Sequence, residues 1–323
     1  MQPVYGRINV HDAGGMAIHL PIVDIGPGAP RFTVVAGIHG DEPSPLLLVD
    51  RFVTALRDVQ LRAGIRIVAA ANPPALLQRS RWSSWDDEDM NRVGDGQNGP
   101  ALTRRLAAAV CEAATGSVLA VNLHNFVMRT PLLAIDPPGL SAERRGRHER
   151  YIEALDPHVV WVFEDTPEGV RTFSTSLDAA LESRGVDTLA VEMADLPELD
   201  EPLLARAISG LMRLAAVCGC LDAAERPLRR TTVRVHRRLM RSPGAGIFEP
   251  LAPLAAPVEE GEVIGDLIPL ERPGDRVPVR ATGSGWLIQR LGRRFVRPGD
   301  MIAAIGLRPT GDRPAAVSQA LRA

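Results

Sequence analysis

The residues of this chain that could do chemistry are two histidines and two glutamates that follow runs of apolar residues. They are His39, Glu42, His124 and Glu192. Two imidazoles and one carboxylate make up the ligand set of a catalytic zinc, which leaves a position open for water. His39 and Glu42 stand three residues apart with Gly40 between them, so both side chains can face one point. The first three residues predict a metal site; the alternative is a capping glutamate with two hydrogen-bonded histidines.

The elements that must position these residues alternate between short β-branched runs and longer amphipathic segments. The pattern predicts strands at 32–38, 65–70, 118–123 and 187–193, and helices at 45–60, 100–114, 175–184 and 201–217. Such alternation is typical of an α/β fold with a mostly parallel or mixed central sheet and helices on both faces. Because ligands bind at the carboxyl ends of strands in such sheets, the four residues should meet at one edge. We assign residues 1–225 to this hydrolase domain.

The pattern changes near residue 226. Residues 226–308 contain short β-like pieces separated by Gly and Pro, which predicts a smaller all-β C-terminal lobe, and 309–323 form a tail. The segment 225–238 (ERPLRRTTVRVHRR) is rich in arginine but has no interleaved aromatic residues. We interpret it as a strand with one solvated face rather than as a nucleic-acid-binding patch.

Composition excludes several classes of function. The 323 residues have a formal net charge of −2, so neither nucleic acid nor an anionic membrane is an expected partner. All 37 cationic residues are arginine, which excludes lysine Schiff-base chemistry and lysine-linked carrier groups. Three cysteines without a CxxC pair predict neither a disulfide framework nor a cysteine zinc site. With no apparent signal peptide or membrane span, the expected location is cytoplasmic.

Five motifs, taken in order, resemble one known family. They are GIHGDE (37–42), NPPALLQRSR (72–81), DEDMNR (87–92), NLH (122–124) and AVEMA (190–194). Together they resemble the succinylglutamate desuccinylase/aspartoacylase family, which is related to the zinc carboxypeptidases. The motifs cover about residues 33–195, and the β-lobe is also similar to the C-terminal lobe of family members.

The resemblance implies one zinc ion per chain, bound by His39, Glu42 and His124. Zinc activates water and polarises a substrate carbonyl. The resemblance also implies that Glu192 takes the proton from the attacking water and passes it to the leaving amine.

It assigns the cations of the motifs to the substrate. Arg81 stabilises the oxyanion, and Arg92 with Asn91 holds a substrate carboxylate in a two-pronged contact. Asp89 orients the neighbouring arginine and loop. Arg79 lies close enough to compete for the first role, but the spacing from the start of the motif favours Arg81.

The chain departs from the family pattern at Asn122, where members usually have Asp two residues before the third ligand. An amide lacks the carboxylate's charge, so its effect on the metal ligand should be weaker. The segments 125–148 and 163–176 are expected to contact substrate. Individual candidates in them are Arg129, His148 and Arg171.

The leading hypothesis is a zinc amidohydrolase that removes an acyl group from a small, anionic N-acylated amino acid or a related amide. A carboxypeptidase acting on short peptides would use the same residues. A non-catalytic protein that binds small molecules in the retained pocket is the alternative from a different class. A homo-oligomer is compatible with each of these hypotheses.

Overall fold

The computed structural model describes residues 2–13, 16–96, 99–163, 166–222 and 232–307. The predicted tail at 309–323 and the predicted boundary near residue 226 lie outside these ranges. Within them, no helix is long and apolar enough to cross a membrane.

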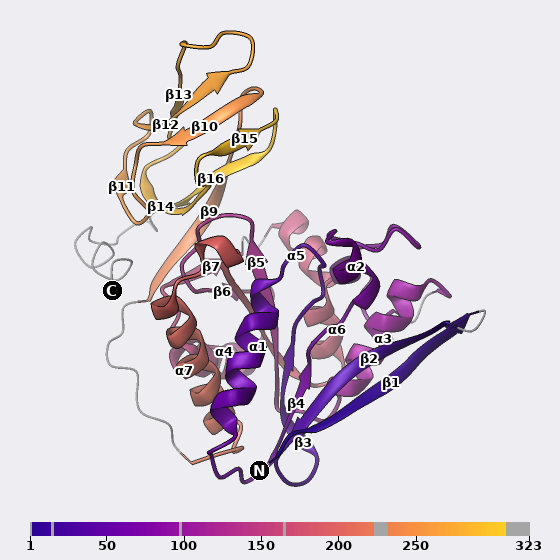
Figure 1. Cartoon of the computed structure of the whole chain (residues 1–323). Coiled ribbons are helices and arrows are strands. Elements are labelled where there is room, and N and C mark those ends of the chain that lie inside the picture. Colours follow the sequence, from indigo (N-terminus) through magenta and orange to yellow (C-terminus); the bar gives the residue numbers. More distant parts are fainter. Residues whose placement is uncertain (1, 14–15, 97–98, 164–165, 223–231, 308–323) are drawn as a thin grey trace.

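A twelve-stranded mixed sheet runs through most of the molecule (Figure 1). Its strand order is β1-β2-β4-β3-β5-β8-β6-β7-β9-β16-β14-β11. The strands are β1 (Val4–Ala13), β2 (Met16–Ile25), β4 (Gly64–Val68), β3 (Pro30–Val35), β5 (Leu119–Phe126), β8 (Asp187–Ala194), β6 (Leu133–Asp136), β7 (Val159–Val162), β9 (Val233–Arg241), β16 (Met301–Leu307), β14 (Gly285–Arg290) and β11 (Pro257–Val258). The central strands β4, β3, β5 and β8 are parallel, so their carboxyl ends share one edge.

Helices cover both faces of the central strands, which confirms the predicted fold class. One face packs against α1 (Ser44–Leu56), α4 (Ala142–Leu155) and α7 (Glu201–Val217). The other packs against α3 (Leu102–Ala114) and α6 (Leu177–Ser183). The described residues also form the short helices α2 (Pro73–Gln78) and α5 (Pro167–Ser174). Apolar side chains on both faces of β3 and β5 are buried, as expected of strands between two helical layers.

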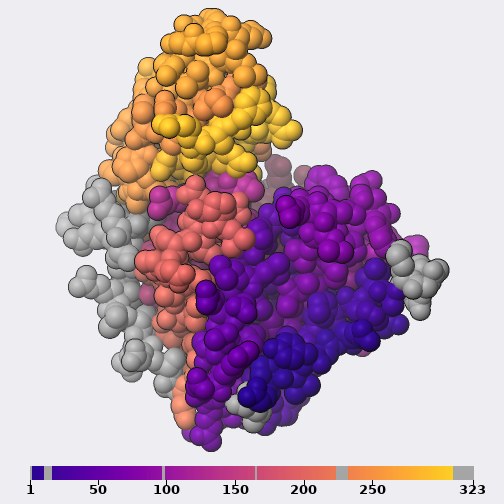
Figure 2. Space-filling model, in the orientation of Figure 1, coloured from indigo at the N-terminus to yellow at the C-terminus, as the bar shows by residue number. Residues whose placement is uncertain are grey.

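The C-terminal lobe is all-β in its described residues, 232–307. Strand β9 pairs in parallel with β7 and antiparallel with β16, so the large sheet continues from the helical part into the lobe. A second sheet, of order β13-β12-β10-β15, packs against it; its strands are β13 (Val277–Arg280), β12 (Val263–Pro269), β10 (Gly246–Pro250) and β15 (Arg294–Val296). In Figure 2 the lobe, orange to yellow, lies directly on the helical part.

Some predicted boundaries were wrong. Strand β3 ends at Val35, so His39 lies in a loop beyond it. His124 lies inside β5, not after it, whereas Glu192 lies inside β8 as the predicted strand 187–193 implies. The β1–β2 hairpin at the sheet edge was not predicted.

Candidate metal centre and active-site pocket

The loop that carries His39 is fixed by two glycines. Gly37 adopts a φ of +71°, which L-residues rarely tolerate. A Cβ on Gly40 would lie 1.9 Å from the carbonyl oxygen of Ala75 in α2, so only glycine fits there. The amide of Gly40 donates to the carbonyl of Ser80 at 2.9 Å. The loop is therefore held against the α2 region, with the His39 and Glu42 side chains turned toward β5.

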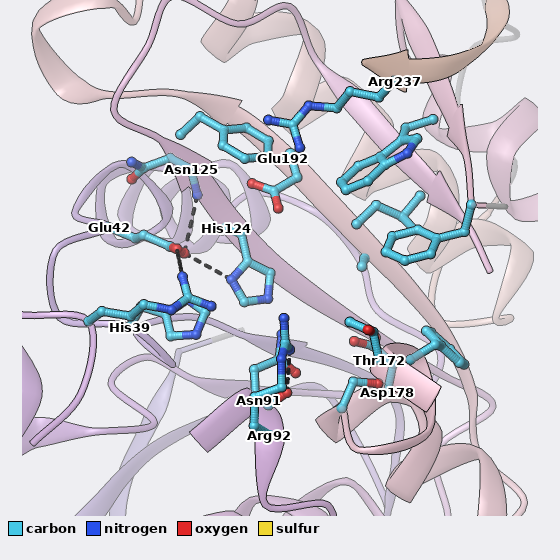
Figure 3. A pocket seen from close by; sticks show the side chains of 18 of the residues that line it. His39, Glu42, Asn91, Arg92, His124, Asn125, Thr172, Asp178, Glu192 and Arg237 are labelled. Atoms are coloured by element: carbon cyan, nitrogen blue, oxygen red, sulfur yellow. Dashed lines mark hydrogen bonds and ion pairs between the residues drawn. The ribbon is translucent and has the colours of Figure 1, made fainter. Parts of the chain in front are cut away.

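His39, Glu42 and His124 converge on one point, as the sequence predicted (Figure 3). Nδ1 of His39 lies 2.7 Å from Oε1 of Glu42, and Nδ1 of His124 lies 2.8 Å from Oε2. All three residues are buried, and their ligand atoms lie within 4.8 Å of one another. The backbone N–H of Asn125 also donates to Oε2 of Glu42, at 3.3 Å.

This donor set fits a divalent metal ion. The Nδ1 atoms of both histidines face the carboxylate of Glu42. Two imidazole nitrogens and one carboxylate oxygen match the N/O ligands of a catalytic zinc. Burial alone would raise the pKa of Glu42, but the adjacent His39 and His124 hold it well below its usual range. Glu42 is therefore an anion at neutral pH, as a metal ligand must be.

Asp89 organises one side of the centre. Its carboxylate accepts hydrogen bonds from Nε2 of His39 at 3.1 Å, from Nε of Arg81 at 2.9 Å and from the backbone of Asn91 at 2.8 Å. A carboxylate on the second ring nitrogen of a metal-binding histidine fixes the tautomer and orientation of the ring. We predicted that Asp89 orients the arginine; it also holds His39.

His124 has no equivalent partner. Its Nε2 is buried and forms no hydrogen bond with any described residue. Asn122, two residues earlier, instead donates through Nδ2 to Asp178 of α6 at 2.8 Å. Both side chains are buried, and burial raises the pKa of Asp178. The carboxylate expected at position 122 is absent, but α6 places one nearby, on the pocket wall.

Glu192 lies next to His124 in the paired strands β5 and β8. Its Oε2 is buried and forms no hydrogen bond with a described residue. Burial raises its pKa to about 7, although the charge of His124 opposes the shift. A carboxyl group with this pKa can both accept and donate a proton near neutral pH.

The three other predicted site residues also line the pocket. Nη1 of Arg81 lies 3.7 Å from Oε1 of Glu42, so its charge faces the metal centre. Oδ1 of Asn91 accepts from the backbone of Leu177 at 3.0 Å, which leaves the Nδ2 hydrogens of Asn91 for another acceptor. Arg92 is exposed at the mouth and donates to the carbonyl of Asn91 at 2.6 Å.

The pocket has a volume of about 300 Å³, which suits a small molecule. Its apolar wall consists of Phe126, Val127, Ile135, Trp161, Phe163, Phe173, Ala190 and Met301. The segments 125–148 and 163–176 therefore do contribute to the pocket. The individual predictions in them were wrong. Arg129 approaches Asp200, His148 is buried against the carbonyl of Ile135, and neither these two nor Arg171 lines the cavity.

The prediction of a solvated arginine face in 225–238 was wrong for Arg237. This residue of β9 lines the pocket, and its guanidinium carbon lies 4.3 Å from the ring centre of Phe126 and 4.7 Å from that of Trp161. The sequence contained a signal for the inward orientation of Arg237. Val233 and Val235 are buried, and residues two apart in a strand face the same side, so Arg237 had to point inward.

Fold and site together define an α/β protein with a candidate metal centre at the carboxyl edge of its sheet. The model of the succinylglutamate desuccinylase/aspartoacylase catalytic domain matches residues 28–218. The chain belongs to this family, as its motifs indicated.

Known relatives match either most of the chain or a shorter part of it. The N-alpha-acetyl-L-2,4-diaminobutyric acid deacetylase of Halomonas elongata is 25% identical over 302 residues, which cover 90% of this chain and 86% of the relative. The succinylglutamate desuccinylase of Burkholderia thailandensis is 37% identical over 90 residues, covering 27% of this chain and 25% of the relative. Among solved structures, the product-bound ectoine utilization protein EutE (DoeB) of Ruegeria pomeroyi shares the fold, with a TM-score of 0.80, 22% identity and 95% of each chain covered.

Proposed function

We propose that this protein is a zinc-dependent deacylase that hydrolyses the amide bond of small N-acylated amino acids. The observation that carries the proposal is the juxtaposition of the buried His39, Glu42 and His124 with Glu192 in one small pocket. The names of the two curated relatives, a deacetylase and a desuccinylase of amino acids, support the same reaction class.

His39, Glu42 and His124 hold the zinc, which when bound activates water and polarises the scissile carbonyl. Glu192 accepts the proton of the attacking water and transfers it to the leaving amine. Its buried Oε2, which forms no hydrogen bond with a described residue, can take that proton, and its pKa of about 7 suits both transfers.

Two groups of donors handle the charges of the substrate. Arg81, oriented by Asp89, stabilises the negative charge that develops on the carbonyl oxygen. Arg92 and the Nδ2 hydrogens of Asn91 bind the carboxylate of the amino-acid part. The substrate is therefore a small anion, which agrees with a pocket of about 300 Å³.

The test is hydrolysis by protein that has been stripped of metal and reloaded with zinc. Substrates are N-acetyl, N-butyryl and N-succinyl amino acids and, for comparison, dipeptides and tripeptides; the released amine is quantified. We expect hydrolysis of N-acyl amino acids that a chelator abolishes and zinc restores. Exclusive cleavage of peptides would make the protein a carboxypeptidase. Binding of N-acyl amino acids without turnover of any amide would make it a non-catalytic binding protein.

A further inference from the structure

The Arg237 side chain is held rigidly at the end of the pocket away from Arg92. In Figure 3, Arg237 lies above Glu192, whereas Asn91 and Arg92 lie on the opposite side of the three metal-binding residues. Phe126 and Trp161 sandwich the guanidinium, and the Trp161 ring stacks in turn on Phe163 with centroids 4.7 Å apart. Cation–π contacts on both faces leave only the edge of the guanidinium for hydrogen bonds.

A chain of buried polar groups fixes the rotation of that edge. Nε of Arg237 donates to Oε1 of Gln289 in β14 at 2.5 Å. The amide of Gln289 is itself oriented, since its Nε2 donates to Oγ1 of Thr130 at 3.2 Å, and Thr130 donates to the carbonyl of Met128 at 3.1 Å. Gln289 is fully buried. The protein therefore holds this guanidinium in place before any ligand arrives.

No anion among the described residues is hydrogen-bonded to the guanidinium. Its Nη2 is buried without a hydrogen-bond partner, and Arg237 forms no ion pair with a carboxylate of the described residues. Glu192 is near enough for their charges to interact but is not bonded to it. A partly buried cation without a hydrogen-bonded counter-ion is costly, and burial lowers the pKa of Arg237 to about 10, against the charge of Glu192, so it still carries its charge at neutral pH. An anionic group of the substrate would supply the missing partner.

We propose that Arg237 is a specificity-determining residue that binds a carboxylate at the acyl end of the substrate. This inference rests on the proposed function and narrows it. With the amino-acid carboxylate at Arg92 and the scissile carbonyl at the metal centre, the acyl chain extends toward Arg237. The substrate class is then N-acyl amino acids whose acyl chain ends in a carboxylate. The aromatic rings beside Arg237 contact the methylene groups of that chain.

The test compares two N-acyl derivatives of whichever amino acid the panel above identifies as best. Succinyl and butyryl groups have similar size and differ by a terminal carboxylate in place of a methyl. We expect the wild type to prefer the succinyl substrate in kcat/KM. Arg237→Met should reduce that preference by about 10- to 100-fold, mainly through KM, with the butyryl substrate little changed. Arg237→Lys keeps the charge without the planar edge, so its succinyl preference should lie between those of the wild type and Arg237→Met.

The matched control is Arg238→Met. Arg238 follows on the same strand, is exposed, and donates to the carbonyl of Thr282 outside the pocket. It should leave the preference unchanged. Should Met at position 237 prevent folding, Gln289→Leu removes the hydrogen bond that orients the guanidinium and should lower the preference to a smaller extent. An equal loss for both substrates in Arg237→Met would overturn the proposal, as would a wild type without succinyl preference.

A binding measurement separates this inference from the proposed function. Calorimetric titration with succinate and with butyrate requires no turnover. We expect succinate to bind the zinc-loaded wild type more tightly, with the difference lost in Arg237→Met and retained in Arg238→Met. If no N-acyl amino acid is hydrolysed, the deacylase function fails, and succinate binding still decides the role of Arg237. If hydrolysis occurs but succinate binds both proteins equally, the role of Arg237 fails alone.

Discussion

The two sides of the pocket satisfy their polar groups differently. On the loop side, formed by residues 39–42 and 79–92, the carboxylate of Asp89 connects His39, Arg81 and Asn91. On the strand side, formed by β5, β8 and β9, six buried side-chain atoms form no hydrogen bond with a described residue, against two on the loop side, Oδ1 of Asp41 and Oε2 of Glu88. The six include Nε2 of His124, Oε2 of Glu192 and Nη2 of Arg237.

The difference indicates that the two sides of the pocket have different roles. Buried polar groups without partners cost free energy, so folded proteins seldom keep them without a use. The loop side orients groups before the reaction, whereas the strand side keeps groups available for a proton or a substrate anion. Violations of hydrogen-bond satisfaction tend to occur at functional sites, and here four residues that line the cavity from the strand side carry such an atom, against one described residue, Asp41, on the loop side.

The largest expected effect is on the strand side. Glu192→Gln should reduce kcat by on the order of 10³-fold, because the amide cannot accept the proton of water. Metal content, measured by elemental analysis, should stay the same, since Glu192 is not one of the three converging ligands. Glu112→Gln, on the exposed side of α3, is the control. A variant retaining more than a tenth of wild-type kcat would assign the proton transfer to another group.

The next effect tests the loop side. Arg81→Met should lower kcat by about 10²- to 10³-fold, the usual loss when a donor to the developing oxyanion is removed. Arg79→Met is the matched control. Arg79 is exposed at the end of α2, two residues away, and has a positive φ of 53° that methionine would share. If Arg79→Met were the more damaging change, the register that assigns the role to Arg81 would be wrong.

Metal affinity should differ between the two sides. Asp89→Asn weakens the carboxylate contact to Nε2 of His39 and should reduce zinc affinity by about 10- to 100-fold. Asp178→Asn should reduce it less than about tenfold, because Nε2 of His124 has no hydrogen bond to lose. Competition with a chromogenic chelator measures both. Equal losses would show that Asp178 acts on His124 as strongly as Asp89 acts on His39.

The sequence predicted most of the fold and the metal centre because the strands and the polar residues near their ends are both visible in local stretches of the chain. His39, His124 and Glu192 follow or belong to apolar strands, and the carboxyl ends of parallel strands meet at one edge. Their proximity therefore follows from strand order alone. The β1–β2 hairpin was missed because it lies at the sheet edge, where the apolar pattern is weak.

Contributions from distant elements could not be predicted in the same way. Asp178 reaches the pocket because α6 packs beside β8, and Arg237 because β9 adds to the sheet next to β7. Both depend on packing that local patterns do not encode. The alternation of Val233, Val235 and Arg237 indicated an inward-facing arginine, but what it would face depended on the pairing of β9 with β7.

The smallest expected effect concerns the support of the strand side, and it is a change in stability. His158 joins the segment after Thr130, the hydrogen-bond partner of Gln289, to β9: its Nδ1 accepts from the backbone of Leu132 at 3.2 Å, and its carbonyl accepts from Val233 at 3.0 Å. Burial lowers the pKa of His158 to about 4, from an ordinary value near 6.5. Between these values the unfolded chain binds a proton that the folded chain does not, so stability falls as the pH decreases.

Lowering the pH from 7 to 5.5 should therefore reduce the free energy of unfolding by about 1 kcal/mol through His158 alone. His158→Asn keeps an acceptor for Leu132 but does not titrate, so it should lose about 1 kcal/mol less than the wild type over the same interval. Urea unfolding at both pH values measures the difference, and above pH 7 the two proteins should show the same pH dependence. An identical loss in both proteins between pH 7 and 5.5 would mean that His158 is protonated in the folded state. A protonated Nδ1 cannot accept a hydrogen bond, so the bond from Leu132 would be broken in that state. The pairing of β9 would then support the strand side without it.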